Sequence, residues 1–323
     1  MNISEKAPKD PFQFTDIFEF MEAFPTDAAA TAHFAQLRWS GKPVCPHCGH
    51  SHVYTYSDGK RYKCAKCQVQ FTVKSGTVFE DSNVGMRKWF MAIYLLTNWK
   101  KGISSHELAR KIKVTQKTAW FMEQRIRFAF KTESFNAPMK GVVEADETFV
   151  GGLEKNKHKN KKTPNVQGRS TVKKTAVLGL KSRTQGVFAK AVETLEWDTV
   201  KEFVTQNVAK GAILMTDEFR AYTGMDAHYD HRVVFHSAKQ YATGVDYDTH
   251  CNGMENYWSH FKRGIIGVHH FISRKHMNLY LAAQSFRYNN CKAQDWQRFR
   301  MTLGQTSGKR ITYKELTKKM EAA

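Results

Sequence analysis

The chain has 323 residues, of which 41% are hydrophobic and 13% aromatic, and its formal net charge is +20. This much apolar material excludes a wholly disordered chain, and the length corresponds to about two domains. The excess of Lys and Arg favours a polyanionic partner, because binding to phosphates releases condensed counterions. No apolar run approaches the ~18 residues of a membrane-spanning helix, and the N-terminus lacks the apolar segment of a signal peptide. We therefore expect a cytoplasmic protein that does not bind a membrane.

The first segment, residues 1–42, predicts two short helices. They cover about Thr15–Ala23 and Asp27–Leu37, and Pro25 separates them. Thr26 precedes the second helix, where its hydroxyl can accept a hydrogen bond from the first helical turn and cap it.

Two Cys-x-x-Cys pairs, fifteen residues apart, lie in the segment 43–80. Each pair supplies two thiolates from one tight turn, and zinc binds four such ligands in a tetrahedron. Redox chemistry is the alternative, which two pairs at this spacing disfavour. A segment this small cannot build a core alone, so the Zn²⁺ of this predicted zinc ribbon is structural. The four predicted ligands are Cys45, Cys48, Cys64 and Cys67.

Residues 84–132 predict a helix-turn-helix bundle. Ser104 and Glu107 have the spacing of a capping box, a turn follows at Lys113–Thr115, and a second helix runs to about Phe130. This motif presents the first residues of its second helix to the major groove of DNA. A helical bundle without a role in DNA binding is the alternative. The predicted DNA-contacting residues are Gln116, Lys117 and Thr118.

From residue 141 the pattern changes to short β-rich runs that alternate with helices, which predicts an α/β domain over residues 141–304. The expected order is β-β-β-α-β-α-β-α, and residues 305–323 are expected to form a peripheral tail. The first strand carries Asp146. The fourth strand ends on Asp217, and the carboxyl ends of strands are where α/β sheets place ligands.

A third acid, Glu255, lies on a predicted helix that begins near Asn252. Apolar residues form one stripe of this helix, while Glu255 and Lys262 lie on another. Taken singly, each of the three acids has an ordinary reading as a turn, cap or surface residue. Together, two strand carboxylates and one helix carboxylate can hold two divalent ions about 4 Å apart. Hard oxygen ligands suit Mg²⁺ or Mn²⁺.

A basic segment lies between the first two strands of this domain. Residues 155–174 contain eight Lys or Arg and no acid. We predict that this segment contacts DNA phosphates, with a solvated loop as the alternative. The predicted contacts are Lys157, Lys159, Lys161 and Lys162.

Four stretches of the sequence carry a resemblance to bacterial insertion-sequence DDE transposases of the Merlin-related group, with an ISXO2-like catalytic domain. The resemblance is nearly full-length. The stretches are EADETFVGG at 144–152, EKNKHKNKK at 154–162, LMTDEFRAY at 214–222 and NGMENYWSHFKRGI at 252–265.

This resemblance implies an α/β ribonuclease-H-like catalytic domain, preceded by the zinc ribbon and the helix-turn-helix bundle. In that domain Asp146, Asp217 and Glu255 are the catalytic triad that binds magnesium. Lys262 matches the basic residue that often follows the last acid in such enzymes. Some relatives use an Asn in place of the final acid, so Asn252 is a rival third ligand.

The predicted function is therefore a transposase that cleaves the ends of an element and joins the freed 3′-hydroxyl to target DNA. Its partner is double-stranded DNA, as terminal inverted repeats and as target, in the bacterial nucleoid. Holding two ends together requires a homodimer or a higher oligomer. One alternative is a catalytically inactive transposase-derived regulator, which the complete set of acids disfavours. The other is a structure-specific nuclease, which would not need the two predicted DNA-recognition elements.

Overall fold

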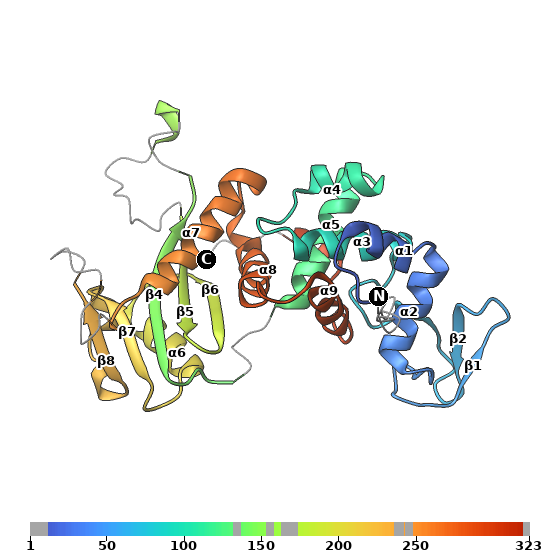
Figure 1. Cartoon of the computed structure of the whole chain (residues 1–323), viewed down its shortest axis with the longest axis horizontal. Coiled ribbons are helices and arrows are strands. Elements are labelled where there is room, and N and C mark those ends of the chain that lie inside the picture. Colours follow the sequence, from blue (N-terminus) through green and yellow to red (C-terminus); the bar gives the residue numbers. More distant parts are fainter. Residues whose placement is uncertain are drawn as a thin grey trace, which may run out of the picture. The chain divides into compact units, whose positions relative to one another are not determined.

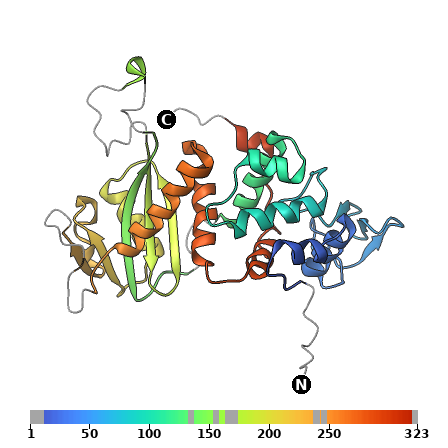
Figure 2. The same ribbon diagram turned by 45° about the horizontal axis from the view of Figure 1, so that its top comes forward.

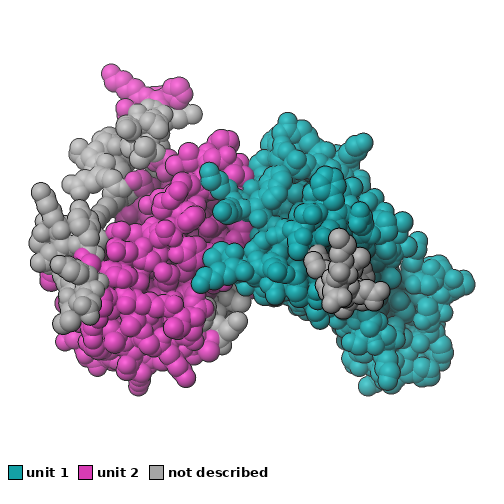
Figure 3. Space-filling view, in the orientation of Figure 1, with its two compact units in different colours: residues 1–130, 290–323 teal, residues 131–289 magenta. Residues whose placement is uncertain are grey.

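The protein is described by a computed structural model, which divides into two compact units: residues 1–130 with 290–323, and residues 131–289 (Figure 3). No helix among the described residues is long and apolar enough to cross a membrane. The structure describes residues 12–131, 137–152, 158–162, 174–235, 242 and 248–318 (Figures 1 and 2).

The first unit begins with α1 (Ile17–Ala23) and α2 (Asp27–Trp39), close to the predicted bounds. Both helices start at a side-chain cap. Asp16 accepts hydrogen bonds from the first turn of α1, and the Thr26 hydroxyl accepts one from the N–H of Ala29, as predicted for the second helix.

A three-stranded antiparallel sheet follows, with the order β1-β2-β3. Its strands are β1 (Val53–Thr55), β2 (Arg61–Cys64) and β3 (Gln70–Thr72). Gly59 turns the β1–β2 hairpin with a φ of 64°, in the left-handed region that favours glycine. The Asp58 carboxylate accepts hydrogen bonds from the backbone N–H groups of Lys60 and Arg61, and these bonds stabilise the turn.

The next two helices, after α3 (Met86–Asn98), are α4 (Ser105–Ile112) and α5 (Gln116–Phe130), and a short turn joins them. Ser104 accepts the N–H of Glu107 at the start of α4, which is the first half of the predicted capping box. The Glu107 carboxylate pairs instead with cations one turn later on α4. The predicted core face of α5 is buried: Ala119, Met122, Ile126 and Phe130.

The C-terminal segment returns to this first unit, through α9 (Asp295–Gly304) and α10 (Tyr313–Thr317). Phe299 packs its ring 5.1 Å from that of Phe90 on α3. The Arg298 Nε donates to Asn98 at 2.8 Å. The compact second unit therefore ends at residue 289, whereas we expected it to extend to residue 304. Residues 305–318 pack into the first unit, where Leu316 is buried and Lys309 donates to the carbonyl of Ala129, so this stretch is not a peripheral tail.

The second unit is a mixed α/β structure around a five-stranded sheet with the order β6-β5-β4-β7-β8. β5 pairs antiparallel with both β4 and β6, and β7 pairs parallel with both β4 and β8. The strands are β4 (Val142–Val150), β5 (Thr175–Ser182), β6 (Gly186–Val192), β7 (Ile213–Asp217) and β8 (Asp230–Val234).

Helices cover both faces of this sheet, and each face has its own core. On one face Leu178 of β5 packs with α6 (Trp197–Asn207). On the other face Val177 packs with α7 (Asn252–Gly264) and α8 (Met277–Asn289). Figure 1 shows α7, in orange, crossing the strands. The sheet thus fixes the position of α7 relative to the ends of β4 and β7.

The connection between β7 and β8 differs from the expected order, which placed an α-helix there. The chain instead makes two single 3₁₀ turns, Arg220–Tyr222 and Met225–Ala227. Gly224 separates them with a φ of 84°, and this left-handed residue ends any continuous helix.

Candidate active site

Two acids meet at neighbouring strands. Parallel β4 and β7 place Glu144 opposite Met215, so Asp146 and Asp217, two residues further along each strand, lie on the same face. Carboxylate oxygens of Asp146, Asp217 and Glu147 all lie within 4.8 Å of one another. This confirms that the two predicted aspartates are neighbours, and it adds Glu147 to them.

Glu147 follows Asp146 on β4, and our reading of the sequence did not include it in the site. Neighbouring side chains alternate across a strand, so Glu147 starts from the face opposite Asp146. Its carboxylate nevertheless reaches the two aspartates. The hydroxyl of Tyr222 is fully buried nearby, and its pKa is raised by burial and then by the negative charge of Glu147. The only signal in the sequence is an acid directly after Asp146.

Helix α7 contacts the acids through Trp258. The indole Nε1–H donates to Oδ2 of Asp146 at 3.1 Å. Gly179, the partner of Asp146 on β5, makes room for this ring, since a methyl group there would lie 2.6 Å from it. Glu255 precedes Trp258 by three residues, so it lies one turn away on the same side of the helix.

Replacing Gly179 tests this close packing. We expect Gly179→Ala to lower the free energy of unfolding by about 1–3 kcal/mol, because Trp258 must move to admit the methyl group. Binding of Mn²⁺ should weaken as well, because Trp258 then leaves Asp146. Urea unfolding and a Mn²⁺ titration measure the two effects. Gly304→Ala, at a helical glycine with open space, is the control. Equal stability of the two variants would contradict the packing.

Glu144 fixes the beginning of α7. It is 1% exposed, and its Oε2 accepts the backbone N–H of Met254 at 3.0 Å. Arg183 and His250 each lie 3.7 Å from its other oxygen. A methyl group on Gly253 would lie 2.6 Å from Oε2, so only glycine allows this approach. The buried carboxylate is thereby paired and orients the helix that carries Glu255.

A cavity of about 870 Å³ opens at this edge of the sheet. The acids that line it are Asp146, Glu147, Asp217 and Glu255, and Lys262 lines it as well. Asn252 is exposed one turn before Glu255 and is not among the described residues that form this cavity.

The electrostatics of the cavity suit a divalent cation. Burial, and then the charge of Asp217, raise the pKa of Asp146 to about 7. Hydrogen bonds from the Glu147 N–H and the Trp258 indole oppose this shift. A cation beside these carboxylates would offset their mutual repulsion, and oxygen ligands are those that Mg²⁺ and Mn²⁺ prefer. The donor set therefore fits the predicted ions.

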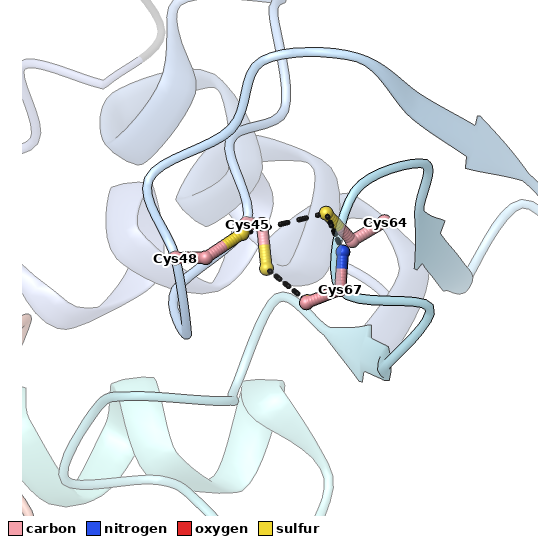
Figure 4. A group of neighbouring side chains, drawn as sticks. All are labelled: Cys45, Cys48, Cys64 and Cys67. Atoms are coloured by element: carbon pink, nitrogen blue, oxygen red, sulfur yellow. Dashed lines mark hydrogen bonds between the residues drawn. The ribbon is translucent and has the colours of Figure 1, made fainter.

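The four predicted zinc ligands converge in the first unit, as Figure 4 shows. The Sγ atoms of Cys45 and Cys67 lie 3.7 Å apart, and those of Cys48 and Cys64 lie 3.6 Å apart. Four sulfurs at about 2.3 Å from one zinc ion are separated by about 3.8 Å in a tetrahedron. The spacing is therefore that of a four-thiolate zinc site.

The predicted DNA-contacting residues of the first unit lie at the start of α5. Gln116 and Lys117 are exposed, and Thr118 is half-buried. The Gln116 amide donates to Ser105 at 2.8 Å, and the Lys117 ammonium lies 4.8 Å from the Tyr313 ring centre. These contacts hold both side chains at the N-terminus of the helix.

The predicted contacts on the basic segment are described only in part. Lys159 begins a single 3₁₀ turn, Lys159–Lys161, and Lys162 follows it; both are exposed. Lys157 and the side chain of Lys161 lie outside the described residues.

A four-cysteine ribbon followed by a mixed sheet with clustered carboxylates is the arrangement of a protein with two separate candidate metal sites. The model of the ISXO2-like transposase domain matches residues 138–289, and that of the transposase zinc-ribbon domain matches residues 25–70. The chain belongs to the ISXO2-like DDE transposases with an N-terminal zinc ribbon.

Two relatives are similar to this chain. An uncharacterized protein in transposable element ISH50 of Halobacterium salinarum is 29% identical over 282 residues, which cover 83% of this chain and 92% of that protein. An uncharacterized transposase-like protein of Haemophilus influenzae is 30% identical over 105 residues, covering 32% of this chain and 81% of that protein.

Proposed function

We propose that the protein cleaves DNA at the ends of an insertion sequence and joins the freed 3′-hydroxyl groups to target DNA. The observation that carries this proposal is the cluster of carboxylates within 4.8 Å of one another beside the Glu255-lined cavity. The sheet order, three antiparallel strands followed by two parallel ones, supports a ribonuclease-H-like fold for this unit.

The chain's residues have separate roles in this proposal. Asp146, Asp217 and Glu255 bind divalent cations, and Glu147 completes the carboxylate set. Bound cations of this kind lower the pKa of an attacking hydroxyl and stabilise the leaving oxygen. Trp258 fixes the orientation of the Asp146 carboxylate, and Lys262 contacts a phosphate of the DNA.

DNA recognition belongs to the first unit in this proposal. We propose that α4 and α5 act as a helix-turn-helix, in which Gln116 and Lys117 at the start of α5 contact base edges in the major groove. Lys159 and Lys162 contact phosphates near the active site. Two DNA ends must be held together, so we propose that the working form is a homodimer or a higher oligomer.

Joining of DNA in vitro tests this function. Duplexes that copy the DNA flanking the coding sequence serve as ends, and a plasmid serves as target. We expect joined products with Mg²⁺ or Mn²⁺ and none with EDTA. Glu255→Gln should abolish joining while Asn252→Ala retains it; the reverse would make Asn252 the third ligand. Tight end binding without joining under any condition would favour a DNA-binding regulator.

Metal affinity should depend on pH because of Asp146. Its carboxyl group has a pKa of about 7, so below pH 7 a cation must displace a proton. We expect the apparent affinity for Mn²⁺ to rise about tenfold per pH unit up to pH 7 and to level off above it. Calorimetric titrations between pH 5.5 and 8.5 measure this slope. A flat profile would mean that Mn²⁺ does not displace a proton from Asp146.

A further inference from the structure

The chain leaves α7 through an unusual turn that presents two exposed apolar side chains. Residues Ile265–His269 form a π-helical turn, and His270 follows with a φ of 57°, which is uncommon for a residue other than glycine. Ile266 and Phe271 are each 72% exposed. Such turns and backbone conformations are frequent at functional sites.

The turn is anchored on both sides of this exposed pair. Ile265 packs against the core beneath α7, and Ile272 belongs to that core. The His269 ring lies 4.9 Å from that of Tyr280 on α8, in an edge-to-face contact. The backbone that carries the two exposed side chains is therefore fixed to the second unit.

Ile266 and Phe271 line the same cavity as the catalytic acids. The cavity has a floor of carboxylates, two lysines (Lys174 and Lys262) and an apolar wall. Divalent cations and the two lysines explain how this cavity binds a phosphate, but they do not explain why part of its wall is apolar. DNA offers one apolar surface of matching size, the face of a base. In a duplex that face is covered by its neighbours, so it reaches a protein side chain only when the base is unstacked.

We propose that Ile266 and Phe271 form an apolar platform for an unstacked base next to the cleaved phosphate of the DNA end. The platform rests on the proposed function, because the acids place that phosphate in this cavity. Nucleotides attached to it then lie against the cavity wall. A base that packs on Phe271 gains affinity without regard to its sequence, because every base has an aromatic face.

The location favours DNA over a second protein copy as the occupant. The two side chains face a cavity that must admit DNA for the acids to act. Lys174 and Lys262 line the cavity together with the apolar residues. An apolar wall beside these cations is complementary to a nucleic acid, which is apolar on its bases and anionic on its backbone.

The test is a coupling measurement between Phe271 and single bases. Wild type and Phe271→Ala are titrated, with Ca²⁺ so that the carboxylates hold a cation, with end duplexes that carry one abasic position each, scanned through the terminal positions. On the intact end we expect Phe271→Ala to weaken binding roughly 5- to 150-fold. At the position that loses the stacked base, the two proteins should bind equally. Phe271→Trp should keep the affinity, and Phe18→Ala, at a 74% exposed phenylalanine of α1, is the control.

Three other outcomes of the binding measurement would overturn the platform. A loss of affinity that is the same at every abasic position would mean that Phe271 acts without touching a base. If that loss accompanies a smaller oligomer in sedimentation, the pair is an interface between copies. Unchanged binding by Phe271→Ala would leave the side chain without this role. The binding measurement requires no cleavage. Coupling between Phe271 and one base in a protein without joining activity would refute the proposed chemistry and support the platform.

Discussion

Asp146→Asn and Asp217→Asn should each reduce metal-dependent DNA joining by about 10³-fold or more. Both carboxylates belong to the set that lies within 4.8 Å, and an amide supplies neither the charge nor the paired oxygens that a divalent cation needs. Mn²⁺ titration should show weakened binding in both variants. Binding to end duplexes should remain, because we propose that DNA recognition belongs to the other unit.

The melting temperature distinguishes this loss of joining activity from a loss of folding. Burial and the charge of Asp217 raise the pKa of Asp146, so the ionised carboxylate destabilises the metal-free fold above pH 7. Asp146→Asn should therefore melt at the same temperature as the wild type, or higher, at pH 8 without metal. Asp198→Asn, at an exposed acid in the first turn of α6, is the matched control and should keep full activity. Near-normal joining by either active-site variant would refute the metal site.

Cys64→Ser should remove zinc from the first unit and abolish DNA binding. Cys64 is fully buried, and its sulfur completes a four-thiolate site. Zinc binding to such sites contributes about 10–16 kcal/mol, which is more than a small three-stranded sheet can replace by packing. Metal analysis should give about one zinc ion per wild-type chain and much less in the variant.

Two further observations complete this zinc test. Cys291→Ser, at an exposed cysteine outside the site, should keep the zinc and the DNA affinity. Cys64→Ser should still bind Mn²⁺, because the carboxylates lie in the second unit. An unchanged zinc content in Cys64→Ser would contradict the ribbon.

The parts of the site that the sequence predicted are those with a local pattern. The cysteine spacing located the zinc ligands, and helical periodicity separated the buried stripe of α7 from the stripe with Glu255. Asp146 could be placed on the first strand, and Asp217 at the end of the fourth strand, because short β-prone runs mark both strands. A strand or helix period is fixed by backbone geometry, so these inferences needed no tertiary information.

The features that the sequence did not predict depend on contacts between distant segments. Strand alternation separated Glu147 from Asp146, although its carboxylate lies within 4.8 Å of those of both aspartates. Glu144 gave no sign that its partner would be the backbone of Met254, 110 residues away. Phe299 likewise has no local feature that marks its ring as part of the core near α3. Periodicity carries no information about which surfaces meet.

The return of the last segment to the first unit has a consequence for how the protein is made. Residues 131–289 are contiguous, so the unit with the catalytic acids can fold while synthesis continues. The first unit cannot finish until α9 has been synthesised and Phe299 has joined its aromatic core. A chain that stops early would thus contain the carboxylates but an incomplete first unit, to which we assign DNA recognition. We expect such a product to be unable to select element ends, which couples targeted DNA cleavage to completion of the polypeptide.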